Sequence, residues 1–117
     1  MTLKEFYDTI GSDYNAVLLR MGGSERIVDK FIRKFPADKT TEQLAEAFES
    51  GDYETAFRMA HTLKGLCSNL GLDKLQSASS ELTEALRGHV ADNAKELLEQ
   101  VQTQHAEIIA ALGQLDA

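Results

Sequence analysis

The chain has 117 residues, enough for one domain, and carries 12 Lys and Arg against 19 Asp and Glu, a formal net charge of −7. Apolar residues make up 43% and charged residues 26%, the balance of a soluble globular protein. A pI near 4.9 without a basic run argues against a nucleic-acid binder, no apolar stretch approaches the roughly 20 residues of a membrane span, and the N-terminus lacks a signal-peptide profile.

The first third of the chain predicts three short helices. One covers about 2–10, and a second covers 14–21 and stops at a glycine pair. Ser24 is the expected N-cap of the third helix, and Pro36 is expected to end it. The apolar positions assigned to the inward face of this third helix are Ile27, Val28, Phe31 and Phe35.

Four longer helices are predicted to follow. Thr40 or Thr41 is the expected N-cap of the first, which ends at Ser50–Gly51. Asp52 is expected to cap a central helix from Tyr53 to about Leu70.

The last two helices have similar signals. Gly71 precedes a helix that Asp73 is expected to cap and Gly88 to end, and Asp92 is expected to cap the final helix. The positions expected inside these three outer helices are Leu44, Ala45, Ala47 and Phe48, then Leu75, Ala78, Leu82, Ala85 and Leu86, then Ala94, Leu97, Leu98, Val101, His105, Ile108, Ile109 and Leu112.

Apolar stripes on polar backgrounds, joined by tight turns, predict an all-α protein. We expect an antiparallel four-helix bundle over about 40–115 with additional short N-terminal helices over about 2–35, forming a single domain over 1–117. The lone cysteine, Cys67, cannot form an internal disulfide, which favours a cytoplasmic protein with an inert buried thiol.

The central helix carries the most informative pattern. At 100° per residue its apolar residues form one seam at spacings of four and three, and that seam must face the core. His61 lies roughly 140° from the centre of the seam, so its imidazole is expected to be exposed near the middle of the helix. The seam consists of Ala56, Ala60, Leu63, Cys67 and Leu70.

Two neighbours distinguish His61 from an ordinary surface histidine. Lys64, three residues on, can place its ammonium beside the imidazole. Gly65, four residues on, costs about 1 kcal/mol relative to alanine in a helix interior, and a side chain there would project over His61. An accessible imidazole with a cation beside it and an open approach suits a phosphoryl acceptor.

The segment Ala60 to Gly65 (Ala-His-Thr-Leu-Lys-Gly), followed by Asn69–Gly71, resembles the signature of histidine-containing phosphotransfer (HPt) domains, and Gly51–Glu54 resembles the usual entry into that family's histidine helix. HPt domains are four-helix-bundle phosphorelay modules. The likeness covers most of the chain. Leu66 and Cys67 depart from the small residues common at their positions, which affects the docking surface rather than the phosphotransfer site.

The resemblance implies that His61 exchanges a phosphoryl group with receiver-domain aspartates, that Lys64 helps to hold the phosphate and that Gly65 provides clearance. It implies response-regulator receivers and a hybrid histidine kinase as partners of a stand-alone, non-enzymatic relay protein. The Mg²⁺ for the transfer is expected on the receiver, so no cofactor or metal is expected here. Phe57 and Ser68 are candidate docking residues, and a monomer is the expected state.

Three alternatives remain. The chain can be a bundle that only binds partners, the phosphotransfer domain of a chemotaxis-type kinase, or, less in keeping with Thr62 after the histidine, a sensor-kinase dimerisation helix. A metal site of histidines and Cys67 is disfavoured, because no metal-binding spacing occurs and Cys67 faces inward. His105 is expected to pack partly buried and His89 to lie exposed in a turn.

Overall fold

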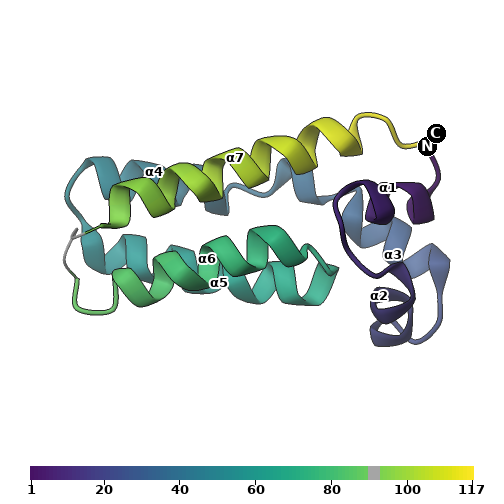
Figure 1. Ribbon diagram of the computed structural model, residues 1–117, viewed down its shortest axis with the longest axis horizontal. Helices are drawn as coiled ribbons and strands as arrows, with labels where there is room; N and C mark the ends of the chain where they lie inside the picture. Colours follow the sequence, from purple (N-terminus) through teal and green to yellow (C-terminus); the bar gives the residue numbers. More distant parts are fainter. Residues whose placement is uncertain (90–92) are drawn as a thin grey trace.

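The computed structural model describes residues 1–89 and 93–117, and it is entirely helical over those residues. The predicted N-cap Asp92 falls outside them. Four helices form an antiparallel bundle in which each contacts the next along the chain and the last contacts the first (Figure 1). They are α4 (Thr40–Glu49), α5 (Tyr53–Leu70), α6 (Asp73–Ala85) and α7 (Ala94–Leu112). The predicted bundle is therefore confirmed.

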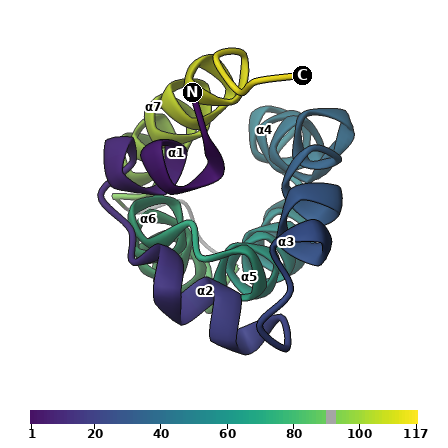
Figure 2. The ribbon, with the colours of Figure 1, turned by 90° about the vertical axis from the view of Figure 1, so that its right-hand side faces the viewer.

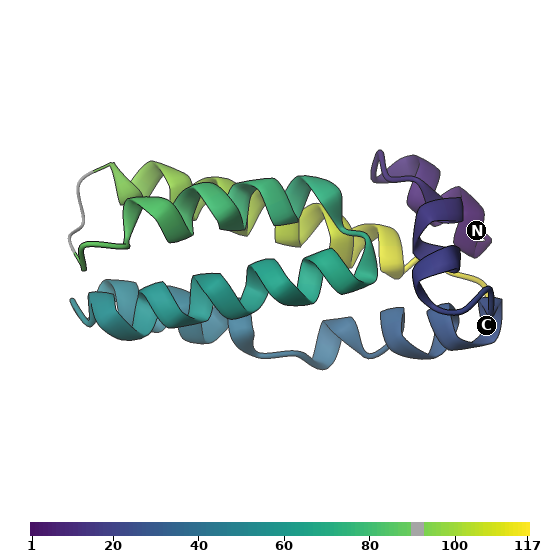
Figure 3. The ribbon, with the colours of Figure 1, turned by 90° about the horizontal axis from the view of Figure 1, so that it is seen from below.

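Three short helices close one end of this bundle. They are α1 (Leu3–Thr9), α2 (Tyr14–Arg20) and α3 (Glu25–Ile32). Figure 2 looks onto this end, where α1 packs against α7 while α2 and α3 both pack against α5. Seen from below, α3 continues the direction of α4, so the two helices together run beside α5 (Figure 3).

The buried face of α3 differs from the prediction. Val28, Ile32 and Phe35 are buried, whereas Ile27 and Phe31 remain 41% and 44% exposed. The sequence contains two apolar stripes about 100° apart, and only one can face the bundle. Ile32, which the predicted face left out, packs inward instead of Phe31.

Several predicted helix ends also shift. Thr40 and Thr41 are not caps but lie buried in the first turn of α4, where the Asp38 carboxylate accepts a hydrogen bond from the Thr40 amide (2.9 Å). Pro36 lies in a separate 3₁₀ turn, Phe35–Ala37, because α3 has already ended at Ile32.

At the start of α6, Leu72 takes the cap position and Asp73 is the first helical residue. The Asp73 amide donates a hydrogen bond to the hydroxyl of Ser12 (3.3 Å). Ser12 lies in a distant N-terminal loop, so the residues around Asp73 in the sequence do not reveal this partner. The helix ends at Ala85, before Gly88. The N-caps predicted at Ser24 and Asp52 are confirmed, since each side chain accepts a hydrogen bond from the backbone amide three residues later.

No helix in the part of the chain that the structure describes is both long enough and apolar enough to cross a membrane. The apolar side chains instead gather in one core shared by the bundle and the three short helices.

Candidate functional site

Helix α5 positions the candidate residues and is secured at both ends. At its N-terminus the Thr55 amide donates to the Asp52 carboxylate (3.1 Å), and hydrogen bonds from Thr55 lower the pKa of that carboxyl. At its C-terminus Gly71 adopts a left-handed conformation (φ 72°), which glycine tolerates without strain. The helix between them is therefore a rigid support for its outer face.

The N-terminal helices hold the C-terminal end of α5. The Tyr7 hydroxyl donates to the carbonyl of Leu70 (2.7 Å), and the Arg20 guanidinium donates to the carbonyl of Ser68. A Cβ at Gly71 would overlap the Val17 side chain. These contacts satisfy carbonyls that a helix end leaves unpaired, and they tie α1 and α2 to the candidate site.

The predicted seam of α5 is buried as expected, with Ala56, Ala60, Leu63 and Cys67 fully covered and Leu70 nearly so. His61 is exposed on the opposite face, near the middle of the helix. The predicted orientation of α5 is therefore confirmed.

The space above His61 is open. Gly65 is exposed, and a Cβ placed on it meets no atom within 4 Å outside its own helical backbone. Neither packing nor backbone conformation therefore requires glycine at this position, and the clearance that Gly65 is expected to give His61 stays a prediction.

Lys64 is half-buried on the side of α5 that faces α6. There Arg87 pairs with Glu84 through two hydrogen bonds (2.7 and 2.9 Å). The pKa of Glu84 is lowered, chiefly by the hydrogen bonds from Arg87 and further by the positive charges of Arg87 and Lys64. Within the described residues Lys64 forms no ion pair, and the carboxylate of Glu84, whose pKa its charge helps to lower, is paired with Arg87. Its ammonium is therefore available to an anion at His61.

Comparison with protein families agrees with this arrangement. The Hpt domain family matches residues 26–116, most of the chain. The chain belongs to the Hpt domain family. Comparisons with curated proteins and with solved structures found no match. Hpt domains are phosphotransfer modules of two-component signalling that interact with receiver domains and kinases. Membership of the family therefore assigns this chain to phosphotransfer in two-component signalling.

The two candidate docking residues lie on different parts of the Hpt domain's α5. Phe57 is half-buried, with its ring 5.4 Å from Arg87 Cζ and 5.7 Å from the ring of His89, two residues that follow α6. Ser68 is half-buried near the C-terminal end of the helix. Phe57 thus presents only part of its ring to a partner, and a docking role for either residue remains a prediction.

The other titratable candidates lie apart from His61. His105 is half-buried, its ring 5.6 Å from that of Phe35, and burial lowers its pKa. His89 is exposed, as predicted. Cys67 is buried, and burial raises the pKa of its thiol to about 12, so it is inert near neutral pH. Within residues 1–89 and 93–117, no three His, Cys, Asp or Glu side chains cluster to hold a metal ion.

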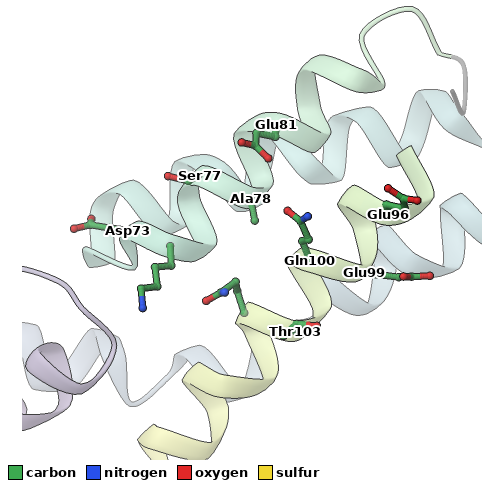
Figure 4. Close-up of a pocket in the computed structure, with 10 residues that line it drawn as sticks. Asp73, Ser77, Ala78, Glu81, Glu96, Glu99, Gln100 and Thr103 are labelled. Atoms are coloured by element: carbon green, nitrogen blue, oxygen red, sulfur yellow. The ribbon is translucent and has the colours of Figure 1, made fainter. Parts of the chain in front are cut away.

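A wide groove of this Hpt domain lies elsewhere. A groove of about 670 Å³ runs between α6 and α7, and its walls carry Asp73, Glu81, Glu96 and Glu99 (Figure 4). Its carboxylates would repel a phosphoryl group, and none of the candidate residues on α5 lines it.

Sequence reasoning missed the exposed apolar residues beside α5. Leu19 on α2 and Ile27 and Phe31 on α3 are exposed, and Phe31 lines a cavity together with Leu66 and Asn69 of α5. The sequence does contain a sign of this exposed face, because Ile27 and Phe31 form a second apolar stripe along α3. The sequence analysis had assigned both residues to the buried face of that helix.

Proposed function

We propose that this Hpt domain is a phosphorelay intermediate in which His61 accepts a phosphoryl group from the aspartate of one receiver domain and passes it to another. The observation that supports this most directly is the exposed His61 imidazole in mid-helix, with Lys64 beside it and open space above Gly65. Membership of the Hpt family makes phosphoryl transfer the chemistry to expect of such a histidine.

The transfer is a substitution at phosphorus. A ring nitrogen of His61 attacks with its lone pair, a nitrogen–phosphorus bond forms, and the bond between phosphorus and the aspartyl oxygen breaks with its electrons returning to the carboxylate. The reverse steps deliver the group to the next aspartate. Lys64 offsets charge on the phosphoryl oxygens, and the missing side chain at Gly65 lets the receiver approach in line.

This chain would act as a phosphorylated carrier rather than as an enzyme, with residues 1–117 working as one monomeric unit. The partners are receiver domains and a hybrid histidine kinase, and the Mg²⁺ that the transfer needs would come with the receiver. In this proposal His61, Lys64 and Gly65 act together, without a cofactor bound to the Hpt domain.

The test is to mix the chain with radiolabelled phospho-receiver domains and to follow label on the Hpt domain. We expect acid-labile, alkali-stable label on the wild type and none on His61→Gln. The matched control is His89→Gln, since His89 is also an exposed histidine, and it should keep the label. Label that persists in His61→Gln would show that another residue accepts the phosphoryl group and would refute phosphotransfer through His61. A wild type that no receiver labels would refute phosphotransfer altogether and favour a pure binding module.

A further inference from the structure

Besides Lys64, a second cation lies against the histidine helix of this Hpt domain. Arg87 follows the last turn of α6, and its Cζ atom lies 5.4 Å from the centre of the Phe57 ring on α5. Phe57 precedes His61 by four residues, so the two side chains are neighbours on the surface of one helix. The Arg87 guanidinium is therefore held against α5 about one helical turn before the candidate phosphoacceptor.

Two hydrogen bonds and an aromatic ring fix the position of this guanidinium. Arg87 Nε and Nη2 donate to the two carboxylate oxygens of Glu84, at 2.9 and 2.7 Å. A bidentate pair of this kind engages both oxygens of the carboxylate and fixes the orientation of the guanidinium. Because the side chains of Arg87 and Glu84 are 59% and 58% exposed, the pair contributes little to stability and can be altered without unfolding the bundle.

The same carboxylate also interacts with Lys64. The hydrogen bonds from Arg87 lower the pKa of Glu84 most, and the positive charges of Arg87 and Lys64 lower it further. In the part of the chain that the structure describes, however, Lys64 takes part in no ion pair. Glu84 thus interacts with two cations and forms hydrogen bonds to only one of them.

Loss of Arg87 would change the partner of Glu84. A carboxylate that loses its arginine is stabilised by pairing with another cation, and Lys64 is a cation whose charge already acts on Glu84. An ammonium that is paired with Glu84 offsets less of the charge on a phosphoryl group at His61. Arg87 would in this way affect transfer at His61 without touching the phosphoryl group.

We infer that Arg87 is a positioning residue for the phosphotransfer site, which holds the Glu84 carboxylate and thereby keeps the Lys64 ammonium free for the phosphoryl group on His61. The inference rests on the proposed function and adds to it two residues outside the histidine helix that set the transfer rate. The effect depends on Glu84, because its carboxylate competes with the phosphoryl group for Lys64.

The competing explanation is that Arg87 binds the phosphoryl group itself. The structure favours positioning, since two donors of the guanidinium are engaged with Glu84 and the group lies beside Phe57 rather than beside His61. The two explanations predict different double variants. An effect that is transmitted through Glu84 disappears when Glu84 is made neutral, whereas a direct contact of Arg87 does not depend on that charge.

The experiment measures the rate of transfer at a saturating concentration of the phospho-receiver domain that labels the wild type fastest. Arg87→Ala should slow transfer about three- to fivefold, because Glu84 then pairs with Lys64 for much of the time. The double variant Arg87→Ala/Glu84→Gln should transfer within about twofold of the wild type, since both charges of the pair are removed together. In a Lys64→Ala background, Arg87→Ala should change the rate by less than about 1.5-fold.

Lys95→Ala is the matched control for the loss of a cation. Lys95 is exposed in the first turn of α7, at the end of the bundle where α6 ends (Figure 1). Its substitution should leave the transfer rate within about 1.5-fold of the wild type. Thermal unfolding of each variant reports whether the fold is retained. Rescue of Arg87→Ala by Glu84→Gln is a second check, because removing a further partner does not restore a lost fold.

The outcomes separate the inference from the proposed function. A wild type that no receiver labels refutes the proposed function, and the inference with it. A wild type that is labelled, together with a folded Arg87→Ala variant that transfers at the wild-type rate, overturns the inference alone. A loss caused by Arg87→Ala that keeps its size in the Glu84→Gln or Lys64→Ala background would assign a direct phosphoryl contact to Arg87 and would also overturn it.

Discussion

Three neighbouring positions on the outer face of α5 are alike in that the fold requires none of their side chains. His61 and Gly65 make no contact that the bundle needs, and Lys64 lies beside an ion pair that is complete without it. Residues that stability does not require are free to serve chemistry, and substitutions at these positions should separate activity from folding.

For Gly65→Leu we expect a folded protein with slow phosphotransfer. The new side chain projects toward the turn that contains His61 and keeps the receiver from its in-line approach, which should slow transfer about 10- to 100-fold. Rapid-quench measurement of transfer, paired with thermal unfolding, checks this. Equal transfer rates in variant and wild type would remove the clearance role.

For Lys64→Ala we expect a transfer rate about tenfold lower, since a cation near the phosphoryl oxygens is lost but the site is open to water that screens it. The free energy of unfolding should change by less than about 0.5 kcal/mol, as for most surface substitutions. Unfolding in urea measures the second quantity, and a large loss there would mean that Lys64 is structural.

At the scale of elements, the two glycines of the α5 region have opposite physical roles. Gly65 is a helical residue with open space around it, whereas Gly71 ends the helix at φ 72° with the Val17 side chain against it. We propose that Gly65 gives access to His61, whereas Gly71 allows α2 to pack against the end of the histidine helix.

Alanine at each glycine therefore makes a matched pair. Gly71→Ala should destabilise the protein by about 2–4 kcal/mol, because it strains the left-handed backbone and overpacks Val17. Gly65→Ala should be neutral or stabilising by up to about 1 kcal/mol. Chemical denaturation of both variants measures the contrast, and equal effects would contradict this account of the two positions.

For the whole molecule, His105 makes the stability of the bundle depend on pH. It projects from α7 toward Phe35, and burial lowers its pKa, while the more distant charges of Asp38 and Glu42 partly oppose this. The unfolded chain therefore takes up a proton at a higher pH than the folded chain does. The stability that neutral His105 contributes is present above the unfolded pKa, about 6.5, and is lost as pH falls through that value toward the folded pKa.

We expect the unfolding free energy of the wild type to fall below about pH 6.5 more steeply than that of His105→Gln. Denaturation curves recorded at several pH values between about 5 and 8 measure both slopes. Parallel curves for the two proteins would show that His105 does not contribute to the acid sensitivity.

Much of the site could be predicted from the sequence because α5 has one apolar seam and no competing one. Small residues and leucines at spacings of four and three leave a single way to bury the helix, and this orients His61, Lys64 and Gly65 outward. The Asp52 cap is likewise a local interaction, and local interactions can be recognised within a few residues of sequence.

Only the tertiary structure decided which stripe of α3 is buried. Ile27–Phe31 and Val28–Ile32 are equally apolar, and the choice between them depends on how α2 and α3 pack against the end of α5. The same holds for the Ser12 hydroxyl at the start of α6 and for Tyr7 and Arg20 at the end of α5, which are partners from distant parts of the chain. Helical periodicity is a local property that one segment carries by itself, so the sequence determined the bundle and the histidine face. Which apolar stripe of α3 stays exposed depends on contacts between segments, and it became apparent only in the folded structure.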